Sequence, residues 1–260
     1  MHLWNRLSLL SLSLSLSLSL ASLVVAAGAQ AASIGAGSLT LDLDGNAFAS
    51  LGGGLPVPGY ELLVLDEHFD QAESAIRDRA AILADEVDAL PSTSGLVYGI
   101  NGASVSNLAL RNSQPTSFTF DPSDVVGTAI GSIGFGGVDR WQVNPLVGGG
   151  VLVIGDFSLA YDSSRAVGAA SGWILYNHFD FLFPAFDLGN VALTAGPDSL
   201  SLSGDVLVTP EFATVFLNSP GDSGRDVGNF SLLATPEPST AIFVGLGLSA
   251  LASTRRRALR

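Results

Sequence analysis

The sequence predicts a mainly β fold, either an antiparallel β-sandwich or an elongated β-sheet, with one long amphipathic helix. Most of the chain after Pro91 consists of short runs rich in Val, Ile, Leu and aromatic residues, separated by Gly, Pro, Asn and Asp. Their spacing of about ten residues is typical of consecutive antiparallel strands joined by short loops. The chain contains no cysteine, so we expect buried apolar side chains, and no disulfide, to stabilise it.

The first predicted elements are a short strand and the helix. Residues 39–43 alternate leucine with polar residues, which indicates a strand with buried leucines, and Asp44-Gly45-Asn46 indicates a turn after it. Over residues 66–90 apolar side chains recur every three or four positions, and Pro91 follows, so we predict one long helix capped by Asp66. Its acidic polar face favours packing of the apolar stripe on the protein's own sheet over binding to an anionic membrane.

The remaining predicted strands follow from alternating or continuous apolar runs. They cover residues 95–100, 104–110, 117–120, 125–133, 151–154, 157–161, 172–176, 191–194, 199–202, 205–208, 213–217 and 229–233. No fixed-period repeat links them, which disfavours a propeller or a regular β-helix.

Residues 1–31 have the pattern of a secretory signal peptide. Arg6 precedes an alternating Leu/Ser segment and a short apolar stretch, and Ala29-Gln30-Ala31 supplies the small-x-small signal-peptidase site, with Ala29 and Ala31 as its small residues. The alternation alone would also suit an amphipathic strand. Its position behind an N-terminal arginine favours the signal peptide, so we expect the Sec machinery and signal peptidase as partners and cleavage after Ala31.

Three features follow one another at the C-terminus: Pro236-Glu237-Pro238, an uncharged apolar run at 239–253, and Arg255-Arg256-Arg257. The prolines favour an extended, stiff peptide exposed to solvent. As a helix, the apolar run would span roughly 22 Å, less than the ~30 Å core of a bilayer, and would be a marginal transmembrane anchor. The arginines resist translocation, which leaves them in the cytoplasm and puts residues 32–234 on the other side of the membrane.

These three parts, in this order, resemble the PEP-CTERM sorting signal of Gram-negative bacteria. The resemblance covers only residues 235–260 and implies export, transient anchoring in the inner membrane, recognition by an exosortase, and release or transfer to the cell surface or the extracellular space, often in exopolysaccharide or biofilm settings. It assigns the recognition peptide to Pro236, Glu237 and Pro238, and the membrane stop to Arg255, Arg256 and Arg257. The alternative is an ordinary membrane tail with a chance Pro-Glu-Pro.

The residues between these two signals, 32–234, are expected to form one β-rich domain with a strongly acidic surface. They contain six arginines and no lysine against 23 acidic residues. A chain without a basic stripe lacks the footprint for a phosphate backbone, so we expect no nucleic-acid partner. Exopolysaccharide is a candidate partner, but an anionic one would be repelled unless calcium bridges the two surfaces.

We expect no cofactor, and calcium is the single candidate ion. Asp42 and Asp44, close to Gly45 and Asn46, could offer oxygen ligands, but the segment lacks the distal Glu of an EF-hand, and a polar turn is the preferred interpretation.

Two segments of the domain contain residue types used in catalysis. Gly221-Asp222-Ser223-Gly224 is similar to the run around the nucleophile of trypsin-like proteases, but neither His68 nor His178 has that family's histidine context. The segment 177–180, with Asp187 nearby, offers a histidine and carboxylates for a metal or a general base. We interpret both segments as loops and predict no catalytic and no metal-binding residue.

A third segment is rich in aromatic side chains, which would form either a sugar-stacking platform or part of the core. It contains Trp173, Tyr176, Phe179, Phe181, Phe183 and Phe186. Taken together, the residues predict an exported, non-catalytic cell-surface or extracellular-matrix protein. The alternatives are a carbohydrate-binding module that acts on exopolysaccharide and, less favoured, a secreted hydrolase.

Overall fold

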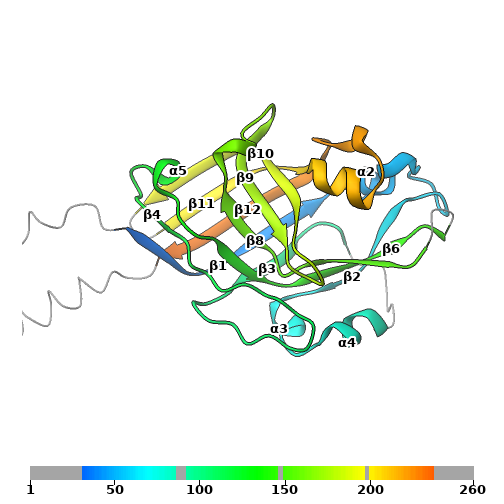
Figure 1. The fold of residues 1–260 in the computed structure, drawn as a ribbon, viewed down its shortest axis with the longest axis horizontal. Coiled ribbons are helices and arrows are strands. Elements are labelled where there is room, and N and C mark those ends of the chain that lie inside the picture. Colours follow the sequence, from blue (N-terminus) through cyan, green and yellow to red (C-terminus); the bar gives the residue numbers. More distant parts are fainter. Residues whose placement is uncertain (1–30, 86–91, 146–148, 197–198, 237–260) are drawn as a thin grey trace, which may run out of the picture. The chain divides into compact units, whose positions relative to one another are not determined.

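The computed structural model describes residues 31–85, 92–145, 149–196 and 199–236, and the described part is mainly β as predicted (Figure 1). Eight strands form a sheet that closes on itself, all neighbours antiparallel. In spatial order they are β1 (Ala32–Leu43), β3 (Leu96–Ile100), β5 (Ile133–Gly136), β8 (Ser158–Tyr161), β9 (Ala170–Asn177), β10 (Phe183–Gly196), β11 (Ser199–Val208) and β12 (Asp226–Pro236). Pairing of β12 with β1 closes the ring and leaves neither strand with a free edge there.

A second, three-stranded antiparallel sheet has β6 (Val138–Val143) between β2 (Leu63–Phe69) and β7 (Val151–Gly155). Gly137, the single residue between β5 and β6, connects the two sheets. It has a φ of 138°, and a Cβ there would lie 2.7 Å from the ring of Tyr98, so only glycine suits this bend.

Short helices and one further strand fill the connections. These are α2 (Gly45–Ala49), α3 (Gln71–Ser74), α4 (Arg79–Ala84), α5 (Val125–Thr128), the two-residue strand β4 (Thr119–Phe120), 3₁₀ turns at Leu51–Gly53, Ser163–Arg165 and Pro220–Asp222, and a π-helical turn, η4 (Phe212–Phe216). In the described part of the chain, each α-helix starts at an aspartate whose carboxylate accepts backbone N–H groups, namely Asp44, Asp70, Asp78 and Asp124. Part of the acidic charge therefore caps helices.

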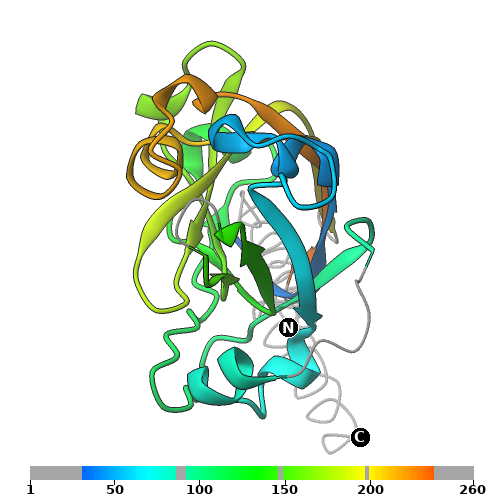
Figure 2. The same cartoon turned by 90° about the vertical axis from the view of Figure 1, so that its right-hand side faces the viewer.

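The main core lies inside the closed sheet and extends under α2. Aromatic rings dominate it: Phe48 stacks on Trp141 with ring centroids 4.5 Å apart, and Phe186 meets Phe48 edge-on. A smaller cluster of Phe69, Ile82, Val138, Val153 and Phe179 packs α4 against the three-stranded sheet. Helices α3 and α4 lie together, away from α2 (Figures 1 and 2).

The long helix predicted over 66–90 is wrong. Asp66 to Phe69 form the end of β2, and α3 and α4 are separate helices of four and six residues. Asp66 is buried inside the strand and caps nothing, while Asp70 and Asp78 start new helices. Ile76, a member of the predicted stripe, is exposed. Residues 86–90 lie outside the described part.

Several strand predictions also differ from the structure. Residues 104–110 are irregular, 125–128 form α5, and 213–217 lie mostly in η4. The short runs at 191–194, 199–202 and 205–208 belong to two longer strands, β10 and β11. The sequence did not predict β2 or β6. The large sheet is closed, where the sequence suggested an open sandwich or an elongated sheet.

Two arginines form buried ion pairs in and beside the three-stranded sheet. Arg140 in β6 donates from Nε to Asp66 of β2 at 2.8 Å and from Nη1 to the carbonyls of Ile82 and Asp85 at 3.0 and 2.8 Å. Arg111 holds both oxygens of Asp156, each at 2.6 Å. Removing one partner of a buried ion pair is costly because the charge of the other partner stays buried, with neither water nor a counter-charge to stabilise it.

We therefore expect Arg140→Met to lower the free energy of unfolding by about 3–5 kcal/mol, since Asp66 would stay buried without its cation. The matched control is Arg79→Met, which removes the exposed partner of Asp180 and should cost at most about 1 kcal/mol. Urea denaturation followed by tryptophan fluorescence measures both. Equal losses in the two variants would contradict the role given to Arg140.

Candidate functional site

The predicted processing residues lie at or beyond the boundaries of the described part. Ala31 is exposed and directly precedes β1, whereas Ala29 lies outside the described residues. Pro236 is the last residue of β12, opposite Ile34 of β1. It is buried, so the expectation of a solvent-facing Pro236 is wrong.

Glu237, Pro238, the apolar run at 239–253 and Arg255 to Arg257 all lie outside the described residues. In residues 31–85, 92–145, 149–196 and 199–236, no helix is long and apolar enough to cross a membrane.

His68 belongs to a polar cluster between the two sheets. Its Nδ1 lies 2.7 Å from Oδ1 of Asp139, and Asp139 also accepts the hydroxyl of Tyr98 from β3. Burial lowers the pKa of His68, but the hydrogen bond and the charge of Asp139 outweigh it, so the pKa is raised above 6.5. Burial also raises the pKa of Tyr98 well above 10. The cluster ties β2 and β6 to β3.

His178 lies in a different buried environment. Its Nε2 is 2.8 Å from the hydroxyl of Ser158 in β8, and burial lowers its pKa. The other residues of the predicted 177–180 cluster point to separate partners: Asp180 pairs with Arg79, and Asp187 with Arg165. They do not converge, and within the described residues no group of three or more histidines and carboxylates is placed to hold a metal ion.

The two aspartates of the predicted calcium segment bind protein groups. Asp42 accepts the hydroxyl of Ser94 at 2.5 Å and the backbone N–H of Gly95 at 2.8 Å, and the hydrogen bond from Ser94 lowers its pKa. Asp44 caps α2, as described above. Both aspartates therefore stabilise the backbone around them, but the predicted turn at Asp44-Gly45-Asn46 is wrong, because these residues begin α2.

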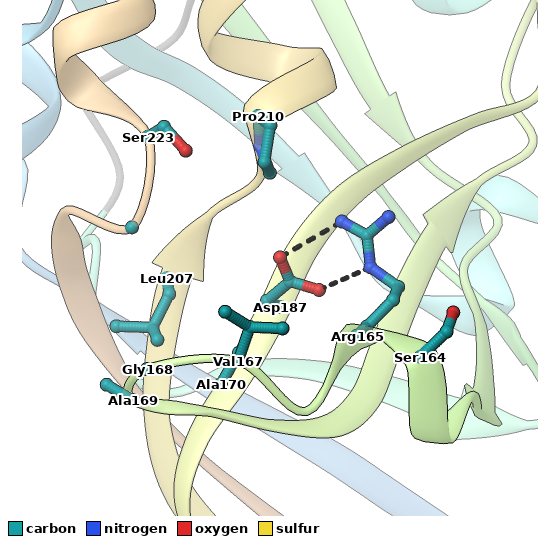
Figure 3. A pocket seen from close by; sticks show the side chains of 11 residues that line it. Ser164, Arg165, Val167, Gly168, Ala169, Ala170, Asp187, Leu207, Pro210 and Ser223 are labelled. Atoms are coloured by element: carbon teal, nitrogen blue, oxygen red, sulfur yellow. Dashed lines mark hydrogen bonds and ion pairs between the residues drawn. The ribbon is translucent and has the colours of Figure 1, made fainter.

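A pocket of about 470 Å³ opens on the outer side of β10 and β11 (Figure 3). Its lining comes from the loop before β9, from both strands and from the segment after β11, and consists of Ser164, Arg165, Val167, Gly168, Ala169, Ala170, Asp187, Leu207, Pro210, Ser223 and Gly224. Ser223, the residue of the protease-like run, lies across the pocket from Arg165. Its neighbour Asp222 instead accepts the backbone N–H of Gly52 at 2.7 Å and Arg225 at 3.1 Å.

Two carboxylates fix the guanidinium of Arg165. Asp187 of β10 accepts from Nε and Nη2 at 2.7 and 3.0 Å, and Glu211 accepts from Nη1 and Nη2 at 2.8 and 3.0 Å. These hydrogen bonds raise the pKa of Arg165 and lower that of Glu211. One guanidinium faces two carboxylates, so the formal charge of the trio is negative.

The pocket combines oriented polar groups with an apolar wall. Asp187 offers carboxylate oxygens as acceptors, and Ser164 and Ser223 offer hydroxyls. Val167, Leu207 and Pro210 form the apolar part. No histidine lines the pocket, which leaves Ser223 without the base that a nucleophile needs. The arrangement is suited to binding a polar, uncharged ligand.

The sequence missed the trio because its members are far apart in the chain and carry no motif. The excess of acidic residues over six arginines predicts that most arginines will pair with carboxylates. It does not predict which carboxylate pairs with which arginine, because that depends on the fold. No protein-family model matches the chain, and no curated protein matches it.

The two histidines predict opposite dependences of stability on pH. The pKa of His68 is raised in the folded state, so its stabilising contribution is complete below pH 6.5 and is lost as the pH rises through the folded-state pKa. The pKa of His178 is lowered, so its contribution is present above pH 6.5 and is lost as the pH falls.

Urea denaturation of the wild type, His68→Gln and His178→Gln from about pH 5.5 to about pH 8 tests this. The difference between the wild type and His68→Gln should shrink as the pH rises, and the difference for His178→Gln should shrink as the pH falls. The same trend in both variants would show that one of the two assignments is wrong.

Proposed function

We propose that this chain is an exported, non-catalytic cell-surface or extracellular-matrix protein. In this proposal residues 239–253 hold it transiently in the inner membrane, and an exosortase recognises Pro236, Glu237 and Pro238. The observation that carries the proposal is the ordered C-terminal sequence of motif, apolar run and arginine cluster, in a chain that also begins with a signal-peptide pattern.

The positions of the first and last described strands agree with this proposal. The strand β1 begins at Ala32, directly after the predicted cleavage site, and β12 includes Pro236, the first residue of the motif. Removal of residues 1–31 and of the residues after the motif would therefore leave the closed sheet whole. The structural roles of His68 and His178 agree with a non-catalytic domain.

A carbohydrate-binding role is the second candidate, and the pocket around Arg165 favours it. The aromatic segment does not form a platform, because Trp173, Phe179, Phe183 and Phe186 are buried in the core and only Phe181 is largely exposed. In the pocket, Arg165 and Asp187 can exchange hydrogen bonds with sugar hydroxyls while the C–H face of a sugar packs on Val167 and Leu207. The net negative charge favours a neutral saccharide over an anionic one.

Sorting predicts that Glu237→Ala/Pro238→Ala will retain the full-length protein in the inner membrane of a Gram-negative host that has an exosortase. This pair of substitutions spares Pro236, which belongs to the fold. The matched control is Ser239→Ala/Thr240→Ala, which leaves the motif intact. Membrane fractionation and intact mass measure the outcome, and unchanged release of the first variant would contradict sorting through this motif.

Saccharide binding predicts that Val167→Trp will obstruct the pocket and weaken retardation of the protein in dextran-containing native gels. Val215→Trp is the matched control, because Val215 has a similar exposed fraction, 73% against 74%, and lies outside the pocket. Alginate, an anionic polymer, should retard neither variant. If dextran fails to retard the wild-type protein, this second function is wrong for that sugar class, and the sorting proposal is unaffected.

A further inference from the structure

The first and last strands place both boundaries of the folded part at one end of the closed sheet. Ile34 is opposite Pro236, and Ala32 is opposite Phe120 of β4. Figure 1 shows β4 and α5 beside the start of β1 and the end of β12. We call this region the terminal end and define it as residues 32–34, 119–130 and 233–236.

The terminal end carries apolar side chains that the fold leaves uncovered. The side chain of Ile130 is 71% exposed. Ile130 lies opposite Thr119 of β4, and Thr119 pairs with Ser33 of β1, which places Ile130 at the terminal end. Val126 in α5 is 44% exposed, and Leu233, near the end of β12, is also exposed. Exposed aliphatic side chains at one end of a sheet are suited to a contact surface.

The amount of chain after Pro236 limits how far this end can lie from a membrane. Only Glu237 and Pro238 separate Pro236 from the apolar run that starts at Ser239. Three residue steps span at most about 11 Å. The headgroup layer on one side of a bilayer is about 5–7 Å thick. An anchored chain therefore has no room to turn another face toward the lipid.

We propose that the terminal end is a membrane-contact surface while the chain is anchored, with Ile130 and Val126 placed in the lipid headgroup layer. This inference rests on the proposed function, because it requires residues 239–253 to be in the bilayer. The partner is the lipid surface itself.

The charges around Ile130 set the depth of the contact. Asp121 and Asp124 lie in the same hairpin, Asp124 caps α5, and backbone and side-chain hydrogen bonds from Ser123 lower the pKa of Asp121. Ionised carboxylates do not enter the hydrocarbon core, so the hairpin stays at headgroup level. For the same reason zwitterionic lipid suits this end better than anionic lipid.

The absence of cysteine from the chain makes a direct test possible, because one introduced cysteine can be labelled alone. Ile130→Cys and the control Val215→Cys are each labelled with an environment-sensitive fluorophore in the full-length chain. Val215 is about as exposed as Ile130 but lies in η4, away from the terminal end. The residue after η4, Leu217, lines a pocket together with Gly52, and Gly52 follows the C-terminal end of β1. The proteins are reconstituted in phosphatidylcholine vesicles that carry a headgroup nitroxide quencher.

We expect several-fold stronger quenching at position 130 than at position 215. A flexible linker of about 20 residues inserted between Pro238 and Ser239 adds a mean reach of about 25 Å and should reduce the quenching at position 130 several-fold. Quenching that is equal at the two positions, or unchanged by the linker, overturns the inference. A blue shift at position 130 without nitroxide quenching means that a second protein copy covers the terminal end, and also overturns it.

Flotation of the vesicles separates failure of this inference from failure of the proposed function. Protein that floats and resists carbonate extraction but shows no preferential quenching at position 130 is anchored, so only the contact surface is wrong. Protein that does not float contradicts the anchor, and with it both proposals.

Discussion

The pairing of β1 with β12 is the constraint on which the rest of the structure depends. It joins the first strand to the last, from Ile34 opposite Pro236 to Leu43 opposite Gly228, and closes a sheet whose other neighbours are nearer in sequence. Contacts between such distant residues form only after a large loss of chain entropy, so closure is expected to be a late and slow step of folding. Both ends of the domain must be present for it, and the same pairing brings these ends together at one place.

Ion pairing is the second organising feature, because the domain has few cations for many carboxylates. In the described part of the chain each of the six arginines contacts at least one carboxylate, in pairs that range from buried, as for Arg140, to exposed, as for Arg79. Other aspartates cap helices. The arginines therefore stabilise the fold by pairing with carboxylates. The acidic residues outnumber them, and the resulting negative charge of the surface favours solubility and disfavours anionic partners.

The sequence predicted what depends on neighbouring residues and missed what depends on distant ones. Alternation of apolar and polar side chains located the strands at 39–43, 95–100 and 229–233 within β1, β3 and β12. It failed over 66–85, because the same apolar spacing fits a helix and also a strand followed by two short capped helices. The pairing of β2 with β6, which lies about 70 residues later in the chain, favours the strand. Closure of the sheet and the meeting of Arg165 with Asp187 and Glu211 have no local signal at all.

Pro236 shows how folding and the proposed sorting can share one residue. Its neighbours Leu232 and Ala234 lie in the core and pair with both β1 and β11, whereas the pairing that the described residues give Pro236 is with Ile34 of β1. The end of a strand opens at a much lower free energy than the whole domain. Proline also has no N–H to contribute to the ladder, so little is lost when it leaves. An enzyme that binds the peptide in extended form can therefore withdraw Pro236 while the sheet stays closed. A motif that began at Leu232 would have to unfold the domain first.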